Sequence, residues 1–199
     1  QLNKYGFIEK GFPYYGFLIG MHTAVLTMAV NLGINLLFYG EDGEVEYGGS
    51  TETKNVSTYD TSYQRKIYLE DGYEKVLRKL DVSESDLYFF TFPSDDELKD
   101  IKLTHWSYYE SWDPYRNYLV AKEHCGLQEN LDSNQGTFTN FAQNDQYLYA
   151  LHTYLMYLKF GFGRATQDVG IEIRRGGMTR EQGLNLVNLY DAYYPEEFT

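Results

Sequence analysis

The sequence has little cysteine, few basic residues and no long uninterrupted apolar run, and each shortage excludes a class of protein. A single cysteine, Cys125, excludes an internal disulfide and a zinc site built from several cysteines of this chain. Lys and Arg number 17 against 29 Asp and Glu, so duplex nucleic acid is not an expected partner, because phosphate binding needs clustered basic side chains. No apolar stretch of membrane-spanning length lacks polar interruption, and no signal peptide is visible. We therefore expect a cytoplasmic protein without a membrane span, in keeping with the single cysteine.

Aromatic residues are abundant instead, with 21 tyrosines among 199 residues. Tyrosine offers a flat ring with a polar tip, which suits stacking on sugars or bases, although most tyrosines serve as core and boundary residues. His105, Trp106 and Tyr108 form one candidate sugar-binding surface. Aromatic residues in strands more often serve packing, so this surface ranks below the alternatives that follow.

Residues 34–39 form a short apolar run between Gly33 and Gly40, which predicts a buried strand. A glycine-rich loop with four acids follows the run: Glu41, Asp42, Glu44 and Glu46. Open α/β sheets bind their ligands at the carboxyl ends of strands, so this acidic loop is the first candidate site.

Residues 15–32 have apolar side chains at helical spacing and almost all round, which predicts a helix buried on more than one side. Gly33 is the expected C-terminal glycine, and a helix joined tightly to a strand indicates an α/β fold with a parallel sheet. Six strand residues cover about 20 Å, the length of about 13 helical residues. His22 is therefore expected level with Glu41, either in a site or as a hydrogen-bonded core histidine.

The remaining chain is predicted to be mostly helical, with one more strand. The expected elements are helices within 62–80 interrupted near Gly72, short helices from Ser83 and Ser94, a strand at 101–109, a helix from Pro114 to Cys125, a polar loop at 127–141, a helix at 142–160, a glycine-led helix within 161–177 and a last helix from Thr179 to about Tyr190.

Two sets of charged residues in the helical half are ambiguous. Asp145, His152 and Lys159 fall seven apart and share one helix face, which is either a site or, more commonly, a solvated face. Arg164 beside a glycine-led helix start suggests an anion site. Arg164 and Asp168 are also four apart, the spacing of an ordinary helical ion pair.

Five ordered blocks resemble the N-acetyl sugar amidotransferases of lipopolysaccharide, capsule and flagellar-glycan biosynthesis. The blocks are GEDGEVEYGG at 40–49, SWDPYRNY at 111–118, GTFTNFAQND at 136–145, MYLKFGFGRATQD at 156–168 and EIRRGGMTRE at 172–181. The resemblance implies a Rossmann-like ATP pyrophosphatase ("PP-loop") fold. Residues 1–110 would be the C-terminal part of an α/β nucleotide-binding domain with a parallel sheet, and residues 111–199 a mainly helical region.

The resemblance also implies a reaction. ATP and Mg²⁺ would adenylate the amide oxygen of a nucleotide-linked N-acetyl sugar, and ammonia from a glutaminase partner would displace AMP to leave an acetamidino sugar. Mg²⁺ and cationic side chains would balance the charge on the phosphates. Carried over by position, the implied roles are catalytic for Glu41 and His22, Mg²⁺ binding for Glu41 and Glu46, phosphate binding for Lys159, Arg164 and Arg174, and cation-orienting or sugar contact for Asp145 and Asp168.

The sequence departs from the family pattern in two respects. A Ser-Gly-Gly-x-Asp-Ser phosphate loop and the cysteine-rich N-terminal segment of the family are both missing from these residues. We therefore expect the chain to correspond to the C-terminal half and to lack adenylating activity alone. The alternative is a non-catalytic nucleotide-sugar-binding or assembly module that relies on another chain for the phosphate loop. The absence of the other half would expose a large apolar face on the first helix, and such a face would favour a homodimer.

Overall fold

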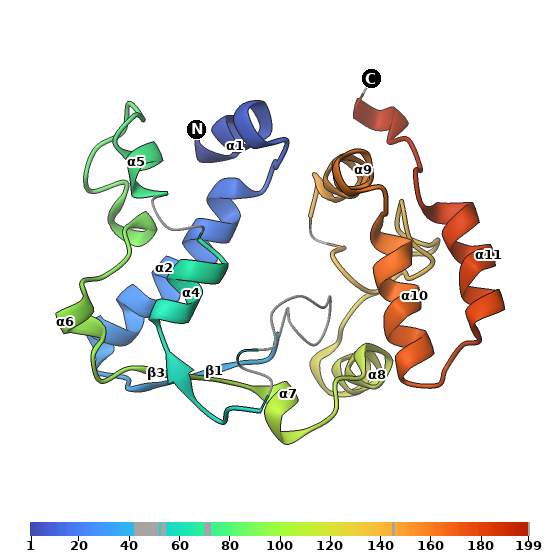
Figure 1. The fold of residues 1–199 in the computed structure, drawn as a ribbon, viewed down its shortest axis with the longest axis horizontal. Helices are drawn as coiled ribbons and strands as arrows, with labels where there is room; N and C mark the ends of the chain where they lie inside the picture. The colour runs from blue at the N-terminus through green and yellow to red at the C-terminus, as the bar shows by residue number, and fades with distance from the viewer. Residues whose placement is uncertain (42–51, 53–54, 70–72, 145, 199) are drawn as a thin grey trace. The chain divides into compact units, whose positions relative to one another are not determined.

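The structure is a computed structural model that describes residues 1–41, 52, 55–69, 73–144 and 146–198. It forms two compact units, Gln1–Ser111 and Trp112–Thr199 (Figure 1). The fold is mixed α/β, with a small sheet in the first unit and helices in both. The Rossmann-like phosphate-loop arrangement remains a prediction.

The first unit contains the sheet and the N-terminal helices. Its elements are α1 (Leu2–Lys10), α2 (Tyr15–Leu32), β1 (Leu36–Tyr39), β2 (Tyr59–Asp60), α4 (Ser62–Ile67), α5 (Glu74–Leu77), η1 (Tyr88–Phe90), α6 (Asp95–Leu98), β3 (Lys102–His105) and α7 (Trp106–Tyr109).

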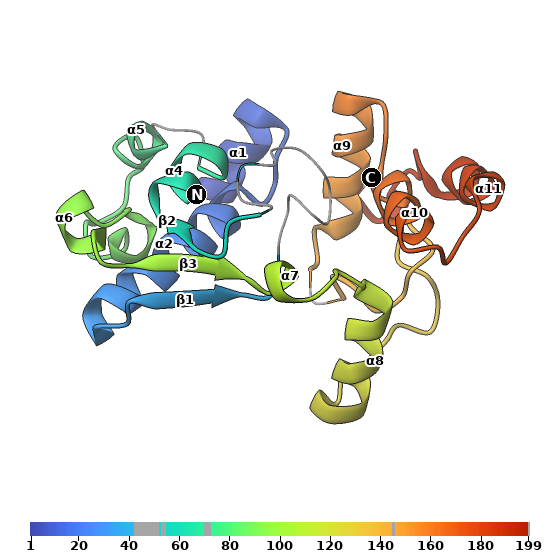
Figure 2. The same cartoon turned by 60° about the horizontal axis from the view of Figure 1, so that its bottom comes forward.

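The sheet has the order β1-β3-β2, and Figure 2 shows β1 and β3 side by side. β1 and β3 are parallel, as the helix–strand pattern predicts, and their last paired residues are Tyr39 and His105. β2 pairs antiparallel with the other side of β3. The strand predicted at 101–109 is shorter than expected, because β1 ends opposite His105 and leaves the next residues without a parallel neighbour. Those residues form α7 instead.

Helix α2 matches its predicted bounds and ends at Gly33, whose φ of 66° is the left-handed conformation of a C-terminal glycine. One face of α2 enters the core through Ile19 and Leu26, which are 1% and 0% exposed. By length and composition alone, α2 could also span a membrane, and 44% of it is buried within the protein.

The predicted burial of α2 and β1 on several sides is wrong. Leu36 and Phe38 of β1 are each 53% exposed, whereas the intervening Leu37 packs on the core. On α2, four apolar side chains are also exposed: Phe17, Val25, Met28 and Leu32. The reason is that the described elements form a core on the face of the sheet that carries Leu37, whereas Leu36 and Phe38 point to the opposite face.

The second unit is built from helices and one long loop. Its elements are α8 (Pro114–Cys125), α9 (Tyr149–Phe160), α10 (Arg164–Arg174), α11 (Arg180–Tyr190) and η2 (Glu196–Phe198). The predicted cap of α8 is present, because the Asp113 side chain accepts a hydrogen bond from the Arg116 amide. Helices α10 and α11 meet closely at the buried Gly183, where a Cβ would lie 2.4 Å from Val169 Cγ1.

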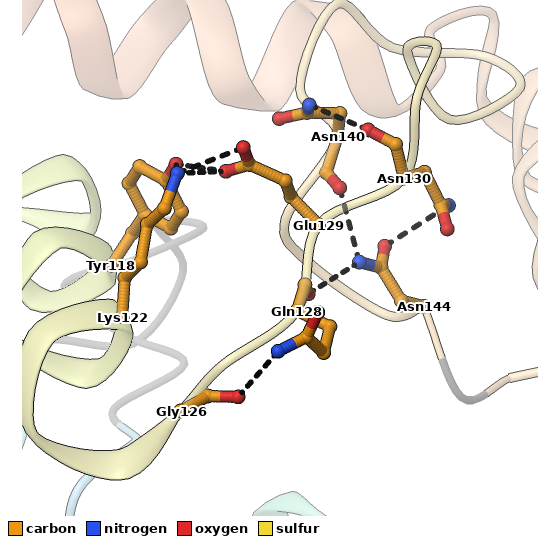
Figure 3. Close-up of polar contacts among 8 residues, drawn as sticks. All are labelled: Tyr118, Lys122, Gly126, Gln128, Glu129, Asn130, Asn140 and Asn144. Carbon is orange, nitrogen blue, oxygen red and sulfur yellow. Dashed lines mark hydrogen bonds and ion pairs between the residues drawn. The ribbon is translucent and has the colours of Figure 1, made fainter.

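Asparagine side chains organise the loop between α8 and α9 (Figure 3). The Asn140 amide donates to the Asn130 carbonyl oxygen at 2.8 Å, and the Asn144 amide donates to the carbonyls of Gln128 and Asn140 at 3.2 and 3.0 Å. These side chains tie backbone groups into a compact loop. Accordingly, α9 begins at Tyr149, later than the residue 142 expected from apolar spacing.

Candidate functional site

Polar side chains gather at the carboxyl ends of the parallel strands β1 and β3. His105 is the last residue of β3 and is 7% exposed. Its Nδ1–H donates to the backbone carbonyl oxygen of Glu41 at 2.8 Å, and its Nε2 forms a hydrogen bond with the Tyr59 hydroxyl. A carbonyl can only accept, so Nδ1 carries a proton. The histidine thus connects the end of β3 to the residue that follows β1.

His22 of α2 lies beside the same strand ends. Its ring stacks on Tyr68 with centroids 4.7 Å apart and lies 6.5 Å from the ring of Tyr39. The side chain is 5% exposed, and neither ring nitrogen has a hydrogen-bond partner within the described part of the chain. Burial, with a smaller contribution from nearby His105, lowers the pKa of His22 to about 4. The imidazole is therefore neutral at pH 7.

Three further buried polar groups surround these histidines. The Tyr39 and Tyr63 hydroxyls and the Gln64 side-chain oxygen all lack a hydrogen-bond partner among the residues with described positions. Burial raises the pKa of Tyr39, and the nearby Gln64 side chain offsets part of that rise. Polar groups so deeply buried normally bond to protein, water or a ligand. We call the following residues the strand-end cluster: His22, Tyr39, Tyr59, Tyr63, Gln64, Tyr68 and His105.

The structure therefore brings two predicted site residues to one place. His22 lies at the end of β1, as the count of helical and strand residues predicts, and Glu41 follows β1 with an exposed side chain. Their connection runs through His105, which the sequence suggested only as part of an aromatic surface. The parallel pairing of β1 with β3 could have indicated the position of His105, since it places the last residue of β3 beside Tyr39.

The expected Mg²⁺ site is not tested by these residues. Glu46 lies outside the described residues. Within the described ranges, no group of three or more His, Cys, Asp and Glu side chains could hold a metal ion. Glu41 alone offers one exposed carboxylate at the strand end, which is too little to define a coordination sphere.

In the second unit, Arg164 and Asp168 form a mostly buried ion pair. Arg164 Nε lies 2.8 Å from Asp168 Oδ1, and the side chains are 12% and 8% exposed. The Thr137 hydroxyl donates to the other carboxylate oxygen at 2.5 Å. Burial raises the pKa of Asp168, and Arg164 and Thr137 act in the opposite direction. The hydrogen bond from Thr137 joins α10 to the loop before α9, and the ion pair lies within α10. Phosphate binding by Arg164 and the role of Asp168 remain predictions.

The amides at the start of α10, predicted to bind an anion, already have one from the chain itself. The Asp191 carboxylate accepts from the amide of Gly163 at 2.8 Å and from the amide and hydroxyl of Thr166 at 3.3 and 2.5 Å. This carboxylate satisfies the helix dipole in the way that a bound phosphate would. The anion site expected at this helix start is therefore occupied by Asp191.

The other predicted residues of the helical half lie apart from the strand-end cluster in sequence and unit. Lys159 and Arg174 are exposed, and the Lys159 ammonium lies 5.3 Å from the centre of the Phe160 ring. His152 is largely buried, and burial followed by Arg164 and Lys159 lowers its pKa to about 4. Asp145 lies outside the described residues. Phosphate binding by Lys159 and Arg174 remains a prediction.

Comparison with known families finds one match in the second unit. Residues 135–199 match the family model described as "LPS biosynthesis protein WbpG-like, C-terminal domain". A comparison with curated proteins gave no match. The matched segment contains α9, α10 and α11 with the Asp168 and Asp191 contacts. The match supports a role in lipopolysaccharide biosynthesis and does not extend to the strand-end cluster.

Proposed function

We propose that this chain is part of an ATP-dependent amidotransferase that converts the N-acetyl group of a nucleotide-linked sugar into an acetamidino group during surface-glycan biosynthesis. The observation that carries the proposal is the strand-end cluster, a set of buried polar groups at the carboxyl ends of parallel strands. The match of residues 135–199 to a lipopolysaccharide-biosynthesis family supports the substrate class.

Each step of the proposed reaction forms one bond and breaks another. The amide oxygen of the sugar attacks the α-phosphorus of ATP, and pyrophosphate leaves. Ammonia then attacks the amide carbon, AMP leaves with the former amide oxygen, and the new nitrogen releases a proton. ATP with Mg²⁺ would supply the leaving group, since an amide oxygen alone leaves poorly.

The strand-end cluster fits recognition of a neutral polar group better than proton abstraction. His22, with a pKa of about 4, is a weak base at pH 7 but retains one N–H donor and one acceptor. We assign His22 to hydrogen bonding with the acetamido group. Glu41, exposed at the end of β1, is assigned to the Mg²⁺–ATP side of the site. The sequence contains no phosphate loop, so the complete reaction requires one from elsewhere in the assembly.

The test is AMP formation by an assembly that contains this chain and a phosphate-binding loop. AMP should appear only when Mg²⁺, a nucleotide-linked N-acetyl sugar and ammonia are all present. Glu41→Gln should lower the rate by at least about tenfold, equivalent to about 1.4 kcal/mol, while the exposed α1 residue Glu9 serves as a matched control through Glu9→Gln. ATP turnover without the sugar, or equal rates for both variants, would contradict the proposal.

A nucleotide-sugar-binding or assembly module is the second candidate, and the missing phosphate loop favours it. Such a module would bind the nucleotide sugar or a glutaminase chain without chemistry. Calorimetry with a nucleotide-linked N-acetyl sugar and with a glutaminase chain tests both candidates against an unrelated role. If the chain binds neither of them, both candidates are wrong.

A further inference from the structure

Gln64 of α4 is the most deeply buried member of the strand-end cluster, with an exposed fraction of 1%. Its backbone is satisfied, because the amide donates to the Thr61 carbonyl at 3.1 Å and the carbonyl accepts from the Tyr68 amide at 3.0 Å. The side-chain oxygen Oε1, by contrast, has no hydrogen-bond partner among the described residues. A buried amide oxygen without a donor is costly, and such groups normally meet a water or a ligand. Oε1 is therefore an acceptor available to a ligand N–H.

The groups beside Gln64 can donate hydrogen bonds. The Tyr39 and Tyr63 hydroxyls are buried and have no partner in the described ranges, and neutral His22 keeps one N–H. The Gln64 side chain offsets part of the rise in the pKa of Tyr39, so these two side chains lie close together. An acceptor beside several donors matches a secondary amide, which has one N–H and one carbonyl oxygen.

The surroundings of Gln64 disfavour a positive charge. No member of the strand-end cluster is Asp, Glu, Lys or Arg, and the side chain of Glu41, which follows β1, is exposed. Burial already lowers the pKa of His22, which means that the charged form of that imidazole is destabilised here. A buried cation needs a paired anion, and the side chains of the cluster supply none.

The proposed reaction changes the ligand in both respects. The acetamidino group of the product has lost the carbonyl oxygen, and like the guanidinium of arginine it is protonated at pH 7 and offers only N–H donors. In the cluster its charge would have no buried counter-ion, and the hydroxyl and imidazole donors would lose their acceptor. A site that hydrogen-bonds one group strongly rejects an analogue that leaves its buried polar atoms unpaired.

We propose that the strand-end cluster binds the neutral acetamido group of the substrate and rejects the protonated acetamidino group of the product, with Gln64 as a specificity-determining residue. Gln64 Oε1 accepts from the amide N–H, and His22 donates to the amide oxygen. This preference rests on the proposed function, which supplies the two groups compared. It means that the reaction itself weakens binding at this site, so the product leaves without competing with the next substrate.

N-Methylacetamide and N-methylacetamidinium chloride test the preference on the folded chain alone. The two probes have nearly the same size and differ in charge and in the carbonyl acceptor. In an NMR titration at constant ionic strength, the ring signals of His22 should shift with the amide, and its dissociation constant should be at least about tenfold lower than that of the amidinium. Equal affinities, tighter binding of the amidinium, or no shift with the amide would overturn the proposal.

Two substitutions test the role of Gln64, with circular dichroism to check folding. Gln64→Met removes the amide oxygen without adding a charge and should weaken binding of the amide probe by at least about tenfold. Gln64→Glu supplies the missing anion and should make the amidinium the tighter ligand. Gln128→Glu adds the same charge to an exposed residue of the second unit and should bind both probes as the wild type does. A folded Gln64→Met protein with wild-type affinity for the amide would overturn the assignment of Gln64.

Failure of this preference can be told apart from failure of the proposed function. No AMP formation by the complete assembly, with the preference for the amide intact, would contradict the proposed reaction and not the preference. Equal affinities for the two probes, with AMP formation intact, would overturn the preference alone.

Discussion

Replacing His22 with phenylalanine should make the first unit more stable. The Phe ring can keep the stacking position on Tyr68, where the ring centroids are now 4.7 Å apart. The substitution removes two buried nitrogens that have no hydrogen-bond partner in the described structure. Burying an unsatisfied polar group costs about 1–3 kcal/mol, so His22→Phe should raise the free energy of unfolding by an amount in that range at pH 7.

The same variant should change the pH dependence of stability. The pKa of His22 falls from 6.5 to about 4 on folding, so the unfolded chain binds the proton first as pH decreases. The contribution of neutral His22 to the free energy of unfolding is therefore fully present above pH 6.5 and is lost as the pH falls from 6.5 to 4. A shift of this size corresponds to about 3 kcal/mol. In His22→Phe this loss disappears, while the similar loss from His152 in the second unit persists.

Urea unfolding at pH 7, 5.5 and 4.5 measures both effects. The chain has two tryptophans, so a Trp112→Phe background leaves Trp106 as a fluorescence reporter in the first unit. The account of His22 as an unpartnered neutral histidine would be refuted if His22→Phe were less stable than the wild type at pH 7. It would also be refuted if the free energy of unfolding of both proteins changed equally between pH 6.5 and 4.

Packing and ion pairing in the second unit give two further predictions. Gly183→Ala should lower stability by about 1–3 kcal/mol in thermal unfolding, because its Cβ would meet Val169 at 2.4 Å; Gly40→Ala, with no atom within 4 Å of the new Cβ, should change little. Asp168→Asn should destabilise by about 3–5 kcal/mol in urea because it leaves Arg164 buried without its carboxylate. An Asp168→Leu, Arg164→Met double variant should recover most of that loss, and equal damage in the single and double variants would contradict the ion-pair explanation.

Local patterns in the sequence predicted the elements but not their exposure. The apolar spacing of residues 15–32 and the following Gly33 gave α2 its correct bounds, and Asp113 with Pro114 gave the correct start of α8. Those signals are short-range. Burial of β1 depends on which elements cover it, and an edge strand has the same apolar composition as a central one.

Long-range contacts explain the differences in the candidate sites. The carboxylate at the start of α10 comes from Asp191, 28 positions after Gly163, and helix periodicity carries no sign of it. By contrast, chain geometry located His22 near Glu41, because a helix and strand joined by a tight turn must run side by side. His105 joins them only through the parallel pairing of β1 with β3, which requires knowledge of the strand order.

The most direct test of the strand-end cluster is a histidine-detected NMR titration of the folded chain with a nucleotide-linked N-acetyl sugar. The chain has four histidines, and His124 on α8 is exposed, so it provides an internal control. The ring signals of His22 and His105 should shift with a common saturation curve while that of His124 stays fixed. Unchanged His22 and His105 signals at saturating sugar, or shifts confined to His152, would contradict the assignment of the site.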